Sequence, residues 1–458
     1  MIYSSLLYVY GFLPLALLIF YASPKKYREM VLLGLSMVFC FSFSLYFLIF
    51  MAVYIILNYT MCRITEYLKS KKSIAEVAIA STVVLDITVL FAFRAPYMSW
   101  FAGMIRAPET IFPIGISLFT LSVTGMLTDV YKGREKAETN IVRYALYVMF
   151  FPRLLIGPVM RYSSFAKAMS QQKTGLAEVG AGLAISVKGL AKKVILADTL
   201  FMLYSAVSVS DDVRIPAVNA WLGVSAYILG IYFELSGLAD MGAGAARCFG
   251  YRFPECFRYP LFSKRINYFA ARWNAPVMQW FRKHISIPLG ASAKNGGARA
   301  AAFLFGWALA GFWYTFRFSG IIAGGMLGAA ILVEKRFRSR NTMKVTGVIY
   351  TLIISAVCVS VFSLDSPSQL LRHFGSLMGS GGFADSSSLY LLREYMPILV
   401  MAAFFSSSLT HKLIRRVSKT KAAGKTAVIQ PVAAAVLLVI CTALIVGSGS
   451  SEQLFIRL

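Results

Sequence analysis

The chain has 458 residues, of which 58% are hydrophobic and only 14% are charged, and its mean hydropathy is +0.67. This apolar surplus is larger than the core of a soluble protein needs, so much of it has to face lipid. Composition therefore excludes a soluble protein and indicates a polytopic integral membrane protein with helical crossings.

The formal net charge of +26 comes from 46 Lys and Arg against 20 Asp and Glu. In a soluble protein this excess would suggest nucleic-acid binding. Here the basic residues fall between apolar segments, which indicates the positive-inside rule and contact with anionic membrane lipid, and no nucleic-acid partner. The six cysteines show no CxxC and no metal-type spacing with histidine, so we predict neither a disulfide nor a metal site.

One helical crossing needs about 20 apolar residues. In the first part of the chain we predict crossings at residues 5–21, two within 30–62 with a turn near Ser42 to Ser44, one at 75–93 and one at 111–127. Basic clusters lie between them, and counting crossings puts these clusters on one side of the membrane. That side should be cytoplasmic, which leaves the N-terminus extracytoplasmic.

In the last part of the chain, basic loops at 335–344 and 412–425 are predicted inside, and the polar loop 363–394 outside. Crossings are predicted at 345–362, 396–409 and 429–446.

The middle of the chain is interrupted. Pro152, Gly157 and Pro158 break one apolar run, and Gly242 with Gly244 breaks another. Irregular backbone at membrane depth has to be surrounded by protein or a water-filled cavity, so we predict broken or re-entrant helices around a central cavity. The predicted fold is an all-α polytopic membrane protein with about eleven transmembrane helices plus these broken helices.

We treat residues 1–458 as a single membrane domain, with N-terminal helices at 1–140, a core at 141–335 and C-terminal helices at 336–458. Within the core, residues 231–314 place carboxylates and many arginines between apolar segments. Charge at membrane depth is costly and marks a functional site by default. A solvated cytoplasmic loop is the alternative interpretation.

Four segments of the chain carry a family resemblance. They are 113–133, reading PIGISLFTLSVTGMLTDVYKG, 151–162, reading FPRLLIGPVMRY, 233–241, reading FELSGLADM, and 250–255, reading GYRFPE. In this order and spacing they resemble the motifs of the membrane-bound O-acyltransferases, the MBOAT family. The most similar branch is the bacterial one that includes alginate O-acetylation proteins and the D-alanyl transfer protein of teichoic acid synthesis.

The resemblance implies a ring of helices around a central funnel in the plasma membrane. It implies a thioester donor, acyl-CoA or an acyl carrier protein, that approaches from the cytoplasm, with no cofactor bound by the chain. The acyl group, most simply acetyl, would reach a cell-surface polysaccharide, often through an extracytoplasmic acyltransferase partner.

The family carries two histidines in this region, and the resemblance places them at Asn274 and Tyr314; a further family histidine corresponds to Leu327. Imidazole takes a proton near neutral pH, whereas asparagine does not titrate and a phenol with its ordinary pKa near 10 stays protonated. Losing a positioned base costs about 10²- to 10⁴-fold in rate, so a direct copy of the family mechanism should be impaired.

Asn274 and Tyr314 are therefore the candidate catalytic positions. Asn274 is alternatively the N-cap of a helix that opens at Ala275 and Pro276. Tyr314 is followed by Arg317, close to the same face of a helix, where a cation would favour a phenol that acts as a base or stabilises an oxyanion. The structural alternative is an aromatic residue beside an arginine that snorkels to the interface.

The remaining histidines are not expected to replace the lost base. His284 occupies an aromatic position of the family pattern and is interpreted as structural. His373 falls in the predicted outside loop, and His411 borders a cytoplasmic one.

The same motifs supply the other candidate residues. The supporting positions are Trp273, Trp313, Arg317, Glu234, Ser236 and Asp240. If Glu234 or Asp240 is buried, its carboxylate could orient a substrate or act as a base. The candidate donor-binding residues, suited to the phosphates of coenzyme A or phosphopantetheine, are Arg153, Arg161, Arg272, Lys264 and Arg265. Topological charge bias explains these basic residues equally well.

Three functional hypotheses follow. The first is an MBOAT-type acyltransferase that acylates a surface polysaccharide with an altered centre. The second is a pseudoenzyme that scaffolds or regulates a partner acyltransferase, because both family histidines are replaced. The third, a transporter, rests only on broken helices and inner charges, and the chain lacks the duplicated halves that many transporters carry.

Overall fold

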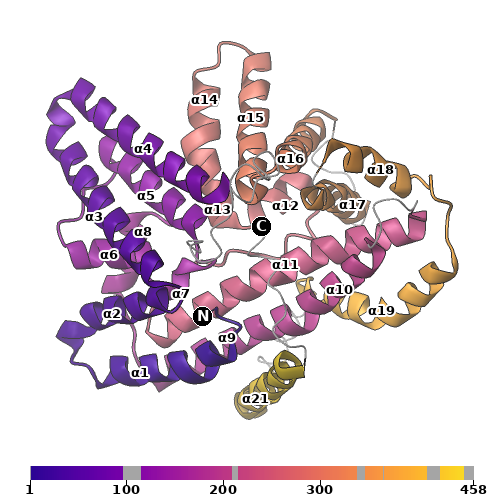
Figure 1. Cartoon of the computed structure of the whole chain (residues 1–458), viewed down its shortest axis with the longest axis horizontal. Helices are drawn as coiled ribbons and strands as arrows, with labels where there is room; N and C mark the ends of the chain where they lie inside the picture. The colour runs from indigo at the N-terminus through magenta and orange to yellow at the C-terminus, as the bar shows by residue number, and fades with distance from the viewer. Residues whose placement is uncertain are drawn as a thin grey trace. The chain divides into compact units, whose positions relative to one another are not determined.

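The computed structural model describes residues 2–95, 115–208, 215–337, 346–364, 366–409 and 423–447, and Figure 1 shows them as helices joined by irregular connections. Every regular element in these ranges is helical. His411, the motif residues at 113–114 and most of the two basic loops at 335–344 and 412–425 lie outside the described residues.

Several described helices are long and apolar enough to cross a membrane. There are six by length and composition: Leu45–Ser70, Lys72–Arg94, Ala217–Cys248, Phe318–Phe337, Thr346–Ser363 and Ser386–Phe405. Three shorter apolar helices accompany them, at Leu7–Ala22, Ile116–Tyr131 and Pro431–Gly447. The chain is therefore an all-helical, multi-pass membrane protein, as composition predicted. The total of about eleven crossings stays a prediction.

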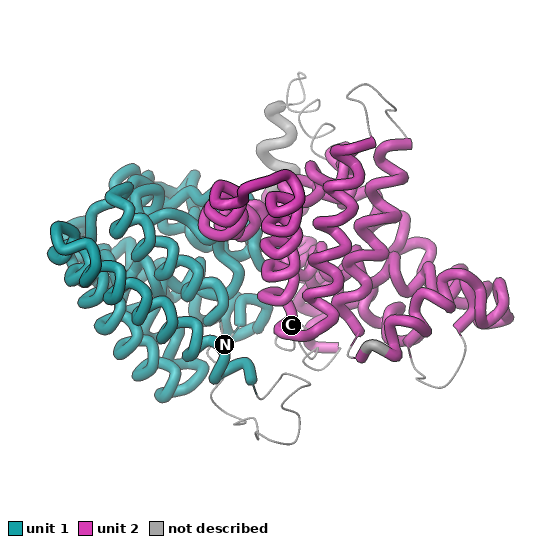
Figure 2. The backbone as a smooth tube through the Cα atoms, turned by 90° about the horizontal axis from the view of Figure 1, so that it is seen from above, with its two compact units in different colours: residues 1–189, 238–255 teal, residues 190–237, 256–458 magenta. Residues whose placement is uncertain are grey.

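The described residues divide into two compact units, shown in different colours in Figure 2. Unit 1 consists of Met1–Gly189 and Leu238–Glu255, and unit 2 of Leu190–Gly237 and Cys256–Leu458. The predicted division near residues 140 and 335 is a separate proposal that these units do not test.

Unit 1 is built from short and long helices in chain order. They are η1 (Leu7–Phe12), α1 (Leu13–Ala22), η2 (Lys25–Tyr27), α2 (Arg28–Phe41), α3 (Leu45–Tyr67), η3 (Leu68–Ser70), α4 (Lys72–Arg94), α5 (Ile116–Tyr131), α6 (Ile141–Met149), α7 (Phe151–Leu154), α8 (Tyr162–Ser170) and most of α9 (Leu176–Ala191). Helices α3, α4 and α5 pack against one another.

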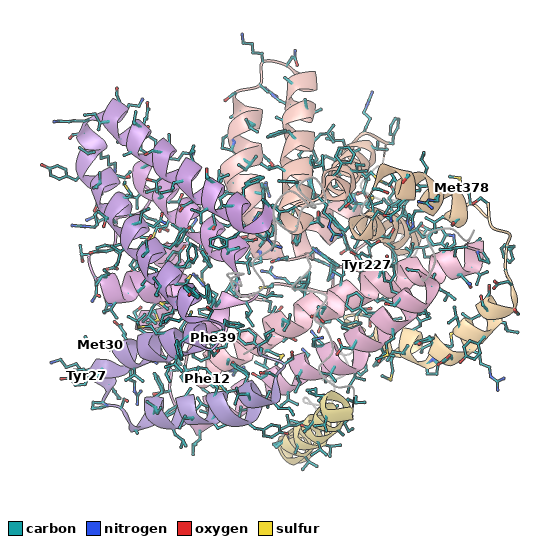
Figure 3. All side chains as sticks on the ribbon, viewed as in Figure 1. Phe12, Tyr27, Met30, Phe39, Tyr227 and Met378 are labelled. Atoms are coloured by element: carbon teal, nitrogen blue, oxygen red, sulfur yellow. The ribbon has the colours of Figure 1, made fainter. Side chains whose placement is uncertain are left out.

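The turn predicted near Ser42 to Ser44 is confirmed, because α2 ends at Phe41 and α3 begins at Leu45. Ser44 is the N-cap of α3, and its hydroxyl accepts a hydrogen bond from the Tyr46 N–H at 3.1 Å. Aromatic rings join η1, α2 and α7. The ring centroids of Phe12 and Phe39, labelled in Figure 3, lie 5.6 Å apart. The Phe151 centroid lies 5.1 Å from that of Phe12.

The break predicted around Pro152 is confirmed. Helix α6 ends at Met149, the single-turn α7 follows, and residues 157–161 are not helical. Pro152 stands in the first turn of α7, where its missing N–H costs nothing. Gly157 packs so closely on Arg153 that an added Cβ would lie 2.3 Å from the Arg153 Cα.

The second predicted break is wrong, since α11 (Ala217–Cys248) runs without interruption past Gly242 and Gly244. These glycines allow close packing instead. A Cβ on Gly244 would lie 2.5 Å from the Gly182 carbonyl oxygen of α9, and one on Gly242 would lie 2.4 Å from that of Pro152. Small residues let membrane helices approach backbone to backbone, which explains glycine here without a kink.

Unit 2 contains the remaining helices. They are η6 (Lys192–Ala197), α10 (Asp198–Val207), the first part of α11, α12 (Ile266–Arg272), α13 (Ala275–Phe281), η7 (Arg282–Ser286), α14 (Ile287–Ala291), α15 (Gly296–Thr315), α16 (Phe318–Phe337), α17 (Thr346–Ser360), η8 (Val361–Ser363), α18 (Pro367–Leu377), α19 (Ser386–Phe405) and α21 (Ala423–Gly447).

The outside loop predicted at 363–394 is partly helical. It contains α18 and the start of α19. Both helices begin with a capping box, formed by Ser366 with Gln369 and by Asp385 with Ser388. These reciprocal bonds satisfy the first free N–H groups and start a helix even in a polar segment.

Candidate functional site

The connection between α12 and α13 fixes Asn274. Its backbone is left-handed, with φ 41° and ψ 56°, and the residue is only 7% exposed. Asparagine is among the few residue types that adopt this conformation readily. The Asn274 carbonyl accepts the first hydrogen bonds of α13, from the N–H groups of Val277 at 3.0 Å and Met278 at 3.2 Å. Its side chain makes no cap bond, so the N-cap interpretation holds for the position and not for the amide.

The hairpin of α15 and α16 fixes Tyr314. Glycines hold the two helices in backbone contact: a Cβ on Gly311 would lie 2.1 Å from the Gly320 carbonyl oxygen, and one on Gly324 would lie 2.2 Å from that of Trp307. Tyr314 stands one residue before the end of α15. The close packing of α15 against α16 therefore fixes the position of the Tyr314 side chain.

The structure brings Asn274 and Tyr314 together. The Asn274 side chain lies next to the Tyr314 phenol. The buried hydroxyl makes no hydrogen bond of regular geometry to any described residue. Positions that the family resemblance paired from distant parts of the sequence thus meet within unit 2.

A small cavity of about 30 Å³ adjoins this pair. Tyr314 and Leu327 line it together with Trp273 from the α12 end and Phe362 from η8. Leu327 is the position of the further family histidine, so all three of the replaced positions lie at or beside one cavity. Its lining is otherwise apolar.

The neighbouring aromatic residues hold the site in place. Trp273 is 8% exposed, and its ring centroid lies 5.3 Å from that of Phe269. The Trp313 ring contacts Phe281 at 5.9 Å. His284 stacks on Trp280 with 4.9 Å between centroids, which agrees with a structural role.

Arg317 does not lie where its spacing from Tyr314 predicted. Helix α15 ends at Thr315, and Phe316 is left-handed with φ 53°. The chain reverses between Tyr314 and Arg317, so the expectation of a shared helical face is wrong. The Arg317 N–H instead donates to the Thr315 hydroxyl at 3.2 Å.

Glu234 belongs to a separate buried ionic cluster in unit 2. The Lys193 Nζ lies 3.2 Å from a Glu234 carboxylate oxygen and 2.5 Å from Asp198 Oδ1. The side chains of Lys193 and Glu234 are 3% and 2% exposed. Lys193 stands on the π-helical segment η6, a local winding often found at functional sites.

Lys193 is the residue that the sequence analysis missed. Its signal was available, because Lys192 and Lys193 interrupt the apolar run between residues 182 and 204. The two other candidate residues of the FELSGLADM segment have partners of their own. Ser236 accepts a hydrogen bond from Lys192 Nζ at 3.5 Å, and Asp240 in unit 1 pairs with Lys188 at 3.6 Å.

The five candidate donor-binding residues divide between the units. In unit 1 Arg153 is buried, donates to the Tyr147 carbonyl and lies 4.6 Å over the Tyr147 ring, while Arg161 is 55% exposed, 3.9 Å from Asp129 Oδ2.

In unit 2 Lys264 and Arg272 are exposed. Arg265 stands at the start of α12, where the following N–H, of Ile266, donates to Glu334 at 2.9 Å. Three of the five cations, Arg161, Lys264 and Arg272, are therefore accessible to a phosphate, with Arg161 paired to Asp129. The donor site stays a prediction.

Comparison with known proteins gives consistent matches along most of the chain. The profile of MBOAT, membrane-bound O-acyltransferase family, matches residues 32–362. The chain is 27% identical to the probable alginate O-acetylase AlgI of Azotobacter vinelandii over 427 residues, 88% of this chain and 85% of that protein.

Two other kinds of relative match shorter stretches. Identity to the peptidoglycan O-acetyltransferase of Helicobacter pylori is 27%, over 50% of this chain and 48% of that protein. Identity to the teichoic acid D-alanyltransferase of Bacillus subtilis is 28%, over 38% of this chain and 44% of that protein.

Proposed function

Because the chain belongs to the membrane-bound O-acyltransferase family, we propose that it transfers an acyl group, in the simplest case acetyl, to a hydroxyl of a cell-surface polysaccharide. The observation that carries the proposal is the family match over residues 32–362. By their names, the relatives act on alginate, peptidoglycan and teichoic acid, which supports a surface acceptor. The comparisons favour neither the scaffold nor the transporter hypothesis.

The Asn274 and Tyr314 pair suits one part of acyl transfer. The acceptor oxygen forms an ester bond to the thioester carbonyl carbon, and the C–S bond breaks. The thiolate leaving group takes up the proton that the hydroxyl loses and departs as a thiol. Negative charge develops on the carbonyl oxygen during attack. A protonated phenol with an amide beside it is a donor set for that oxygen, whereas neither group accepts a proton readily at pH 7.

The direction of transfer follows from the charge bias of the loops. We place the chain in the plasma membrane with its N-terminus extracytoplasmic and its basic loops inside. An acyl-CoA or acyl carrier protein thioester would then meet Lys264 and Arg272, two exposed cations of unit 2. An extracytoplasmic acyltransferase that acts on the same surface polymer is the expected protein partner.

A transfer assay on the purified protein in lipid nanodiscs tests the proposal. Label should pass from acetyl-CoA or an acetylated carrier protein to an added polysaccharide. Tyr314→Phe, which removes only the buried hydroxyl, should lower the rate by about 10²- to 10³-fold, the usual loss of one oxyanion donor. Tyr268→Phe is the matched control, because Tyr268 is 50% exposed on the neighbouring α12 and should keep wild-type activity.

Variants at Asn274 sharpen the result. Asn274→Gly keeps the left-handed backbone and removes the amide, so it should fold normally and lose activity. The double variant Asn274→His with Tyr314→His tests the opposite view, since histidine also tolerates this conformation. Transfer that appears only in the double variant would show that the native centre is silent and would contradict the proposal.

A further inference from the structure

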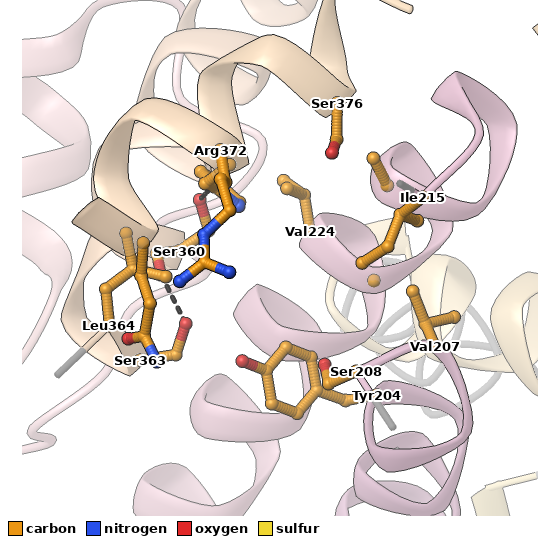
Figure 4. A pocket seen from close by; sticks show the side chains of 14 residues that line it. Tyr204, Val207, Ser208, Ile215, Val224, Ser360, Ser363, Leu364, Arg372 and Ser376 are labelled. Carbon is orange, nitrogen blue, oxygen red and sulfur yellow. Dashed lines mark hydrogen bonds between the residues drawn. The ribbon is translucent and has the colours of Figure 1, made fainter. Parts of the chain in front are cut away.

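Helix α18 is amphipathic, and its polar side faces the interior of unit 2. It borders a polar pocket of about 260 Å³ that is also lined by the ends of α10 and α17 and the first turns of α11. Four polar residues of α18 line this pocket: Gln369, Arg372, His373 and Ser376. Figure 4 shows Arg372 and Ser376 on the side of the helix that faces the space. The apolar side of the helix therefore points away from the pocket.

The apolar side of α18 is exposed. Leu371 and Phe374 belong to it, and Met378, seven residues after Leu371, continues it at the C-cap. Leu371 is 78% exposed and Met378 is 88% exposed. Phe383, in the connection that leads to α19, is 80% exposed. Large apolar side chains this accessible on one short segment indicate contact with an apolar surface, because leaving them in water is unfavourable.

The chain ties the start of α18 to the end of a membrane span. The span that contains α17 ends at Ser363, and α18 begins at Pro367. Four residues of extended chain reach about 14 Å at most, so the start of α18 cannot lie far from the membrane boundary. Its capping box, in which Ser366 and Gln369 exchange hydrogen bonds, starts the helix at that point.

Hydrogen bonds tie the end of α18 and the connection after it to a second span. Helix α11 is long and apolar enough to cross a membrane. In its first turn, the Val218 N–H donates to the Phe383 carbonyl at 3.0 Å. Trp221 Nε1 donates to the Leu377 carbonyl at 3.3 Å. Both ends of the segment 367–383 are thus fixed where membrane spans end.

The exposed apolar surface continues into α19. This helix is the least buried of the six candidate spans in the described chain, so most of its side chains face lipid. Its first turn adds Leu389, which is 72% exposed, and Tyr390, which is 65% exposed. Because the apolar side of α18 leads directly into a lipid-facing surface, lipid is the partner that it fits.

We propose that α18 and the connection after it lie in the headgroup layer of the membrane, with Leu371, Met378 and Phe383 inserted among the lipid acyl chains. The helix is too short to span the bilayer, and it separates the lipid from the pocket. Ser380, exposed and polar between the inserted side chains, stays at the level of the headgroups, where water reaches it. Part of the predicted outside loop 363–394 therefore rests on the membrane.

Spin labels measure the depth of this segment in nanodiscs that hold one copy of the full chain. All six native cysteines are buried, so the label reacts at an introduced cysteine. Leu371→Cys and Met378→Cys replace exposed side chains and remove little packing. Each label should lie about 5–10 Å into the boundary between headgroups and acyl chains, and should be more accessible to oxygen than to a water-soluble nickel complex.

Two controls calibrate the measurement. Val400→Cys, at a 60% exposed position within α19, should report the hydrocarbon core. Lys136→Cys, at an exposed position in the connection between α5 and α6, should report water. If the labels at positions 371 and 378 behave like the label at position 136, this face is solvated or is reserved for a protein partner, and the proposal is overturned.

A measurement on the unmodified protein keeps the test open if a variant does not fold. Lipids that carry a photoactivatable diazirine near the start of an acyl chain should cross-link to residues 371–383, and mass spectrometry locates the adducts. Adducts confined to the membrane spans would contradict the proposal. Neither readout uses acyl transfer, so the outcome is independent of the proposed function.

Discussion

At the residue scale, the ionic cluster around Lys193 is a costly feature of the molecule. One ammonium group lies between the Glu234 and Asp198 carboxylates, and the side chains of Lys193 and Glu234 are nearly inaccessible. Taking charges out of water costs several kcal/mol each, and the mutual attraction of the group offsets that cost only while the group is complete.

We therefore predict that Lys193→Met destabilises the protein strongly, by about 3–5 kcal/mol, because it leaves Glu234 as an uncompensated buried charge. Thermal unfolding of the purified protein in detergent measures this loss. Adding Glu234→Gln to Lys193→Met should restore part of the melting temperature, because the stranded charge is removed. A single variant as stable as the wild type would mean that the cluster is solvated.

Residue identity at the candidate site was predictable, but its environment was not. The sequence marked Asn274 and Tyr314 through the motif frames, and the structure brings them together. It could not show that the chain reverses at Phe316, because a left-handed residue that is neither glycine nor asparagine has no sequence signature. That reversal separates Arg317 from the helical face of Tyr314.

At the element scale, glycine is the residue that sequence reasoning interpreted wrongly. Glycines in an apolar run suggest a break, yet in α11 and in the α15–α16 hairpin they mark close helix contacts. Local sequence cannot separate these two uses, because close contact depends on the partner helix. The start of α18 carries a capping pattern in Ser366, Pro367 and Gln369, but the sequence analysis predicted a loop there and did not use that pattern.

Adjacent glycines in α16 provide a controlled test of this contact. A Cβ on Gly324 would lie 2.2 Å from the Trp307 carbonyl oxygen, whereas one on Gly325 would meet nothing within 4 Å. Gly324→Ala should push the hairpin apart, lower the melting temperature and reduce acyl transfer, since Tyr314 depends on the hairpin. Gly325→Ala should leave the stability of the folded protein unchanged or raise it by about 0.5–1 kcal/mol, because alanine lowers the conformational entropy of the unfolded chain. Equal effects of the two variants would argue against backbone contact in the hairpin.

At the scale of the whole molecule, composition and charge bias predicted an all-helical, multi-pass membrane protein, and the described helices agree. The described helices do not show which side of the membrane each loop faces. That orientation depends on the lipid environment and on the basic loops, most of whose residues lie outside the described ranges. The charge bias makes a definite prediction nonetheless. Residues after α16 should be cytoplasmic, and those after α18 extracytoplasmic.

Cysteine labelling tests this orientation with little background, because all six native cysteines are buried. Arg336 at the end of α16 and Ser380 after α18 are both exposed, so a cysteine at either position should react with an aqueous maleimide. In right-side-out vesicles a membrane-impermeant maleimide should label Ser380→Cys and spare Arg336→Cys, and inverted vesicles should give the reverse. Labelling of both variants from one side would show that α17 does not cross the membrane. The reversed pattern would place the residues after α18 in the cytoplasm and would contradict the orientation that the charge bias predicts.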